Sequence, residues 1–163
     1  MTPAKGSFST RYDGEIDGFV AASEKLHSKS VSIVHQIIPT EIDVRGTKAL
    51  AESWCIIDTR IDRDGPEYDM KTYLRFFNQC EKVEGKWKLL TLEPIYVRDI
   101  ITPVPPAPVL DFGDLSGFRK SYRFTAWMVG QRGLTIHDDL PGEDDPESMR
   151  EVTDRNRAWI EAP

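Results

Sequence analysis

The chain has 163 residues, the length of one domain, and its 39% hydrophobic and 29% charged residues are ordinary for a globular protein that buries a core of its own. No apolar run reaches the ~20 residues of a membrane span, and the first residues lack the apolar centre of a signal peptide. The net charge of −6 comes from the segment after Ile136, which holds nine acids and three bases. A neutral body with an acidic tail argues against nucleic acid and anionic membranes as partners.

The first half of the sequence predicts one short strand, one helix and a run of long strands. Apolar and polar residues alternate over residues 6–12, and apolar residues recur at helical spacing over residues 18–27. Four extended segments follow, at residues 31–38, 48–61, 68–82 and 86–98. Because segments of this length are long for strands, we expect a bent, strongly coiled antiparallel sheet.

The second half predicts a connector and two helices. The prolines of residues 102–115 exclude a helix or an inner strand, so this segment should run over the surface. Residues 116–133 are expected to form a helix, and a second helix should start with Asp145 as N-cap and Pro146 at the first helical position. The predicted fold class is therefore α+β, with a sheet domain over residues 1–101 and a helical extension over residues 116–163 that packs on it.

Alternation along the second long strand separates two sets of side chains. The odd positions of residues 48–61 are small and uncharged, which suits the wall of a cavity, whereas the even positions are bulky and charged. Leu50, Trp54 and Ile56 belong to the second set and would be exposed on the outer face of the sheet, so we expect a homodimer through that face. The two cysteines, Cys55 and Cys80, fall inside strands, which predicts reduced thiols and a cytoplasmic protein.

Several strings resemble the SnoaL-like branch of the nuclear transport factor 2-like superfamily. They are "IVHQI", "RGTKALAESW", "RDGPEYD" and "YLRFFNQCEKVEGKWKLLTLEP", and the likeness covers roughly residues 6–100. This branch is similar to scytalone dehydratase, bile-acid 7α-dehydratase and certain polyketide cyclases. The resemblance implies a cone-shaped half-barrel with an apolar pocket and chemistry that needs no cofactor and no metal. Members usually open with a helix pair, which we expect this chain to lack.

The resemblance and the residue chemistry together nominate a site. A histidine can accept and return a proton near neutral pH, and the pocket histidine of the dehydratases matches His35. Asp69 would hold the tautomer of His35, and Tyr12 or Tyr68 would stabilise charge on a substrate oxygen. The competing interpretations are a core histidine, a turn acid facing water and tyrosines at a core edge. The remaining predicted substrate contacts are Ser53, Cys55, Ile57, Thr59, Leu74 and Phe76.

Two classes of function remain open from the sequence. The first is a small lyase or isomerase, of dehydratase or cyclase type, that acts on a hydrophobic polyketide- or steroid-like substrate with His35 as base and then acid. The second is a non-catalytic module of the same fold that binds a small molecule or pairs with another subunit. A structure that encloses the His35 ring would favour the first class.

Overall fold

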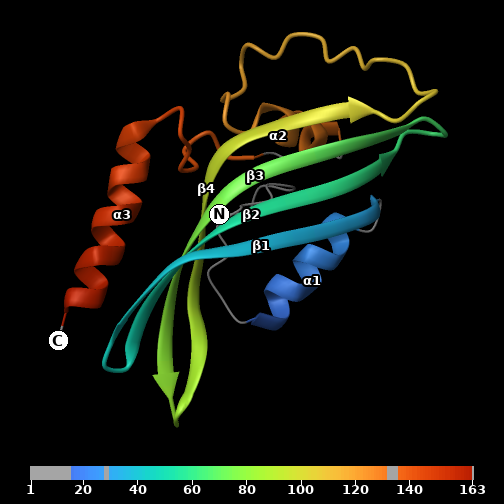
Figure 1. Cartoon of the computed structure of the whole chain (residues 1–163). Coiled ribbons are helices and arrows are strands. Elements are labelled where there is room, and N and C mark those ends of the chain that lie inside the picture. Colours follow the sequence, from blue (N-terminus) through green and yellow to red (C-terminus); the bar gives the residue numbers. More distant parts are fainter. Residues whose placement is uncertain (1–15, 28–29, 132–135, 163) are drawn as a thin grey trace, which may run out of the picture.

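The computed structural model describes residues 16–27, 30–131 and 136–162. Three helices and four strands follow one another along the chain (Figure 1): α1 (Ile16–His27), β1 (Ser30–Arg45), β2 (Lys48–Asp62), β3 (Glu67–Val83), β4 (Lys86–Pro103), α2 (Arg123–Gln131) and α3 (Pro146–Glu161). The α+β class expected from the sequence is confirmed. No helix among these residues is both long enough and apolar enough to cross a membrane.

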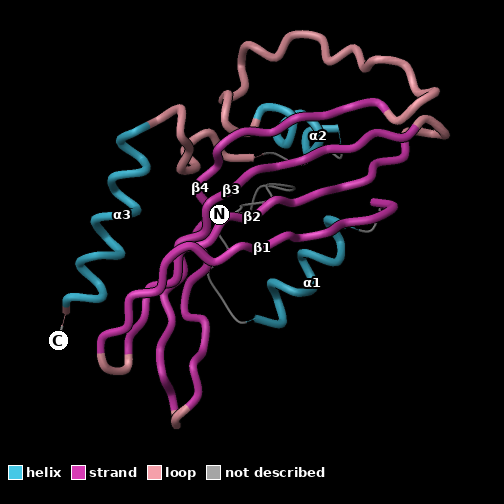
Figure 2. The backbone as a smooth tube through the Cα atoms, in the orientation of Figure 1, coloured by secondary structure: helices cyan, strands magenta, loops and turns pink. Residues whose placement is uncertain are grey.

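The four strands form one antiparallel sheet in the order β1-β2-β3-β4. The β1–β2 and β3–β4 turns each contain a glycine at positive φ, Gly46 and Gly85, which a side chain would strain. The strands are 15 to 18 residues long and coil strongly along their length (Figure 2), as their length in the sequence predicted.

β1 continues past the residue at which we expected it to end. The prediction stopped at Ile38 because proline and turn residues follow, but the strand runs on to Arg45. A register shift between Pro39 and Glu41 places one extra residue in β1 at this point. Since β1 is an edge strand, Pro39 can lack an amide hydrogen without breaking an inner ladder.

The two C-terminal helices pack on opposite faces of the sheet. We call inner the face that carries Thr72 and Leu74, and outer the face that carries the alternate residues of β3. α2 covers the inner face, where the Thr125 and Thr72 hydroxyls lie 3.0 Å apart. On α3, the Asn156 Oδ1 accepts a hydrogen bond of 2.9 Å from Gln79 Nε2 on the outer face. The buried residues of β3 are accordingly the even-numbered ones up to Phe76, under α2, and the odd-numbered Gln79 beyond it, under α3.

The main core lies between the inner face and the segment that contains α2. It consists of Cys55, Leu74, Phe76, Tyr96, Tyr122, Ala126 and Leu140, with Ile57 and Ile136 packed against it. The rings of Tyr96 and Tyr122 have centroids 4.9 Å apart in a tilted arrangement. These side chains occupy the part of the inner face where the family resemblance implied an apolar pocket.

The helix expected over residues 116–133 is shorter in the structure. α2 begins only at Arg123, and the preceding residues form turns, with a 2.8 Å hydrogen bond from the Ser116 amide to the Asp114 carboxylate. α3 starts as predicted, because the Asp145 side chain accepts hydrogen bonds from the Glu147 and Ser148 amides and Pro146 follows it.

Candidate functional site

A cavity of about 270 Å³ opens on the inner face, between the end of α2 and the turn that joins β2 to β3. Its walls come from β2, β3, β4 and α2, and its apolar lining consists of Ile61, Tyr68, Ile101, Trp127 and Met128. Strand alternation explains the sheet side of this wall, since Ile61 pairs with Tyr68 across β2 and β3 and both side chains are buried.

Contacts of Tyr68, Trp127 and Arg63 fix the cavity walls. The Tyr68 hydroxyl donates a 3.0 Å hydrogen bond to the Pro108 carbonyl, so the proline-rich segment closes one side. The Phe112 ring meets the Trp127 ring edge-on, with centroids 5.0 Å apart. On the other side the Arg63 guanidinium lies over Trp127, 5.0 Å from the ring centroid. These contacts hold the two aromatic rings of the cavity wall in place.

The structure does not enclose His35. It pairs with Ile57 and therefore lies on the inner face, but β1 is the edge strand and the His35 side chain is exposed. α2 contacts β4 and reaches Thr72 on β3, so it covers the other half of the face. The expectation that the ring points into an apolar hollow is therefore not met, and the catalytic role of His35 stays a prediction.

Asp69 lies on the opposite face from His35. Its carboxylate pairs with Arg60 through contacts of 2.6 and 3.2 Å, in a cross-strand pair on the outer face. The same guanidinium also reaches Glu67, at 2.9 Å. The prediction that Asp69 holds the tautomer of His35 is wrong, because the carboxylate is committed to Arg60 and the sheet separates the two side chains.

The predicted substrate contacts divide into three groups. Tyr68 lies in the cavity wall, and its role as a substrate contact stays a prediction. Ser53, Cys55, Ile57, Thr59, Leu74 and Phe76 also face inward but are buried or packed in the core, so the prediction that they line an open pocket is not met. Tyr12 lies outside the described residues. Burial also raises the pKa of the Cys55 thiol, which suits a core residue and opposes a nucleophile.

Asp99 is a buried polar residue of the inner face that was not among the predicted site residues. It pairs with Thr72 across β3 and β4, is 6% exposed, and accepts a 2.6 Å hydrogen bond from the Thr125 amide in the first turn of α2. Its second oxygen, Oδ1, has no hydrogen-bond partner among the described residues. Burial raises the pKa of this carboxyl group, and the hydrogen bonds from the start of α2 oppose the shift.

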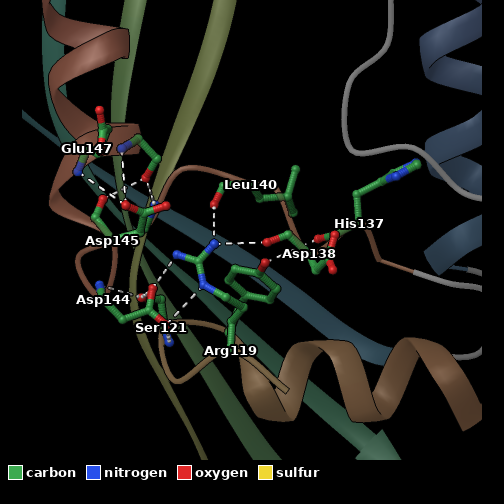
Figure 3. Close-up of polar contacts among 11 residues, drawn as sticks. Arg119, Ser121, His137, Asp138, Leu140, Asp144, Asp145 and Glu147 are labelled. Carbon is green, nitrogen blue, oxygen red and sulfur yellow. Dashed lines mark hydrogen bonds and ion pairs between the residues drawn. The ribbon is translucent and has the colours of Figure 1, made fainter. Parts of the chain in front are cut away.

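A second polar cluster joins the segment before α2 to the start of α3 (Figure 3). The Asp144 carboxylate accepts hydrogen bonds from Arg119 at 2.5 Å and from the Ser121 hydroxyl at 2.6 Å. Arg119 also donates to the carbonyls of Asp138 and Leu140. Burial alone would raise the pKa of Asp144, but the hydrogen bonds from Arg119 and Ser121 outweigh it and hold that pKa well below its usual range. Because these polar groups bond to one another, the cluster holds the segment before α2 against the segment before α3.

Within the described ranges, no three histidine, cysteine or acidic side chains are grouped closely enough to hold a metal ion. Of the acids in residues 138–145, Asp144 pairs with Arg119 and Asp145 caps α3 as expected. The chemistry of the inner face therefore depends on the aromatic cavity and on Asp99.

A coiled antiparallel sheet with a helix on each face and an inward cavity defines an α+β domain of the nuclear transport factor 2-like class. The chain belongs to the SnoaL-like domain family, whose family model matches residues 3–93. Over 140 residues it is 31% identical to a PEP2-like protein and 30% identical to pea pathogenicity protein 2, both of Fusarium vanettenii. Each alignment covers 82% of this chain and 60% of the relative, so the chain spans about three fifths of these proteins' length.

Proposed function

We propose that this domain binds a small, mainly apolar molecule in the cavity between Tyr68 and Trp127. The observation that carries the proposal is the cavity itself, about 270 Å³, with two aromatic and three aliphatic side chains beside four polar ones. Small-molecule sites combine apolar and aromatic walls with a few polar groups, and the volume of this cavity is just below the ~300 Å³ at which such sites begin. A ligand with one or two fused rings matches this size, and it is smaller than the steroid-like substrate expected from the sequence.

Binding without chemistry is the reading we favour, because of the groups that face the cavity. The described residues of its wall include no imidazole, and the Tyr68 hydroxyl is already hydrogen-bonded to Pro108. The carboxylates that line it, Asp62 and Asp64, belong to exposed turn residues. A general acid or base must lie within hydrogen-bond reach of the reacting proton, and none of the buried lining residues provides one.

Tryptophan fluorescence tests the proposal directly. Titration with a panel of naphthalene and indole derivatives should quench the protein's emission, and Trp127→Phe should remove the larger part of the change. Trp54→Phe is the matched control, because Trp54 lies on the outer face. Saturable binding by calorimetry that weakens in Trp127→Phe supports the cavity. Signal changes confined to Trp54, or no saturable binding across the panel, would refute it.

A second candidate function is the acid–base reaction that the family resemblance implies. One observation favours it: His35, Ile57, Thr72 and Asp99 form a cross-strand row on the inner face. Three strand spacings separate the ends of this row, about 14 Å, and α2 covers its Thr72 and Asp99 end. Mass-spectrometric detection of product from a panel of cyclic hydroxy-ketones, abolished by His35→Gln and Asp99→Asn alike, would support catalysis. Turnover that survives both substitutions would exclude it.

A further inference from the structure

We propose that the cavity selects flat apolar ligands that carry a carboxylate, and that Arg63 recognises this group. The inference rests on the proposed function, since it names the ligand class of the same cavity. It follows from the position of one guanidinium, from the absence of a carboxylate paired with it, and from the aromatic surface on which it lies.

Arg63 is directed toward the cavity by the geometry of β2. Ile61 faces inward, Asp62 is the last residue of β2 and lies opposite Glu67, and Arg63 follows it at the rim of the cavity. The turn that follows is closed by a 2.9 Å hydrogen bond from the Arg63 amide to the Pro66 carbonyl. The Arg63 guanidinium then lies over the Trp127 ring, which forms the cavity wall.

The guanidinium has no carboxylate within ion-pair distance among the described residues, although both of its chain neighbours are acids. The Asp62 carboxylate instead accepts a 2.8 Å hydrogen bond from the Gly65 amide within the turn. Asp64 has a left-handed φ of 56° in the same turn and is exposed. On the outer face, by contrast, Arg60 and Arg75 are each paired with glutamate or aspartate.

An aromatic carboxylate can contact the apolar cavity wall and the Arg63 guanidinium at the same time. Its ring can pack against Trp127 and the aliphatic side chains of Ile61 and Ile101, and its carboxylate can accept two parallel N–H bonds from the guanidinium. Asp62, Asp64 and the C-terminal end of α2 at Gln131 oppose the anion. An exposed ion pair is therefore expected to improve binding by only about threefold to fivefold.

Three probes with the same ring system separate the head group from the ring. Naphthaleneacetic acid, naphthaleneethanol and naphthaleneethylamine are titrated into the full chain by calorimetry at low and at high salt. We expect the acid to bind about threefold to fivefold more tightly than the alcohol, and the difference to shrink at high salt. Arg63→Gln should remove the difference in affinity between the acid and the alcohol.

Arg98→Gln is the matched control, because the Arg98 guanidinium also lies over an aromatic ring, 4.7 Å from the centroid of Tyr73, but on the outer face. Its preference for the acid should match that of the unchanged chain. Equal affinity for all three probes, or tightest binding of the amine, overturns the role of Arg63 and leaves the cavity as a binding site. Failure of the alcohol and the acid alike to bind overturns the proposed function itself.

Discussion

Replacing Asp144 with asparagine should destabilise the fold far more than a typical surface change. In the structure the carboxylate accepts from Arg119 and from both the hydroxyl and the amide of Ser121. The substitution removes the negative charge while keeping the shape, so Arg119 is left half-buried without its ion-pair partner. Among the described residues, this guanidinium keeps its contacts with the loop carbonyls of Asp138 and Leu140 and the ring of Tyr122, and Asp145 is the carboxylate that still acts on its charge.

The magnitude follows from the burial of the pair. Removing one partner of a fully buried ion pair costs about 3–5 kcal/mol, whereas exposed pairs contribute about 0–1 kcal/mol. The side chains of Arg119 and Asp144 are 22% and 20% exposed, so the pair lies nearer the buried limit. We therefore expect Asp144→Asn to lower the free energy of unfolding by about 2–3 kcal/mol at pH 7.

Urea denaturation followed by circular dichroism measures this change, and pH identifies its cause. Because the folded-state pKa of Asp144 lies below its unfolded value near ~3.9, its contribution is present above that value and is lost as the pH falls through the folded pKa. The difference between the two proteins should therefore shrink below about pH 4. Asp43→Asn, in an exposed pair with Arg45, is the control. A loss below 0.5 kcal/mol, or one equal to that of the control, would refute the reasoning.

Three further predictions concern the packing of the chain and its pairing with a second copy. Gly142→Ala should cost about 1–3 kcal/mol in urea denaturation, because the added methyl carbon would lie 2.8 and 2.9 Å from two side-chain oxygens, while Gly117→Ala has open space and should cost much less. Iodoacetamide should label Cys80 before Cys55 in the native protein, since Cys55 is fully buried; equal rates would contradict this burial. We propose that two chains pair through the outer face, so Trp54→Glu should shift sedimentation from a dimer toward a monomer. A variant that sediments like the unsubstituted chain, or an unsubstituted chain that is itself a monomer, would exclude that contact.

The sheet could be read from the sequence because its signals are local. β2, for example, starts at Lys48 as expected and ends one residue beyond the predicted Ile61. The predicted boundaries are wrong where a residue distant in the sequence determines where an element begins or ends. The bulge after Pro39 carries β1 on for seven residues beyond Ile38, and α2 begins at Arg123 because the carboxylate of Asp99 meets its first turn from another element. Neither partner can be inferred from residues that adjoin the boundary.

The candidate site was harder to predict because it depends on which face each side chain occupies. The alternation that places Thr72 and Leu74 inward already assigns Asp69 to the outer face. The family resemblance placed Asp69 in the site although this alternation contradicted it. The same alternation, extended beyond Ile61, would have pointed to Arg63. Asp99 is different, since the register shift between Arg98 and Tyr96 breaks the alternation of β4 just before it.

The start of α2 determines where the inner face is open. A helix beginning at Ser116, as the sequence suggested, would extend along more of the face than the nine residues observed, which span about 14 Å. Because Asp99 and Thr72 fix the first turn of α2 near the middle of the sheet, its last turn brings Trp127 and Gln131 to the β2–β3 end. The buried carboxylate thus positions the aromatic wall of the cavity without lining it. The geometry of the proposed binding site therefore depends on a side chain that does not line it.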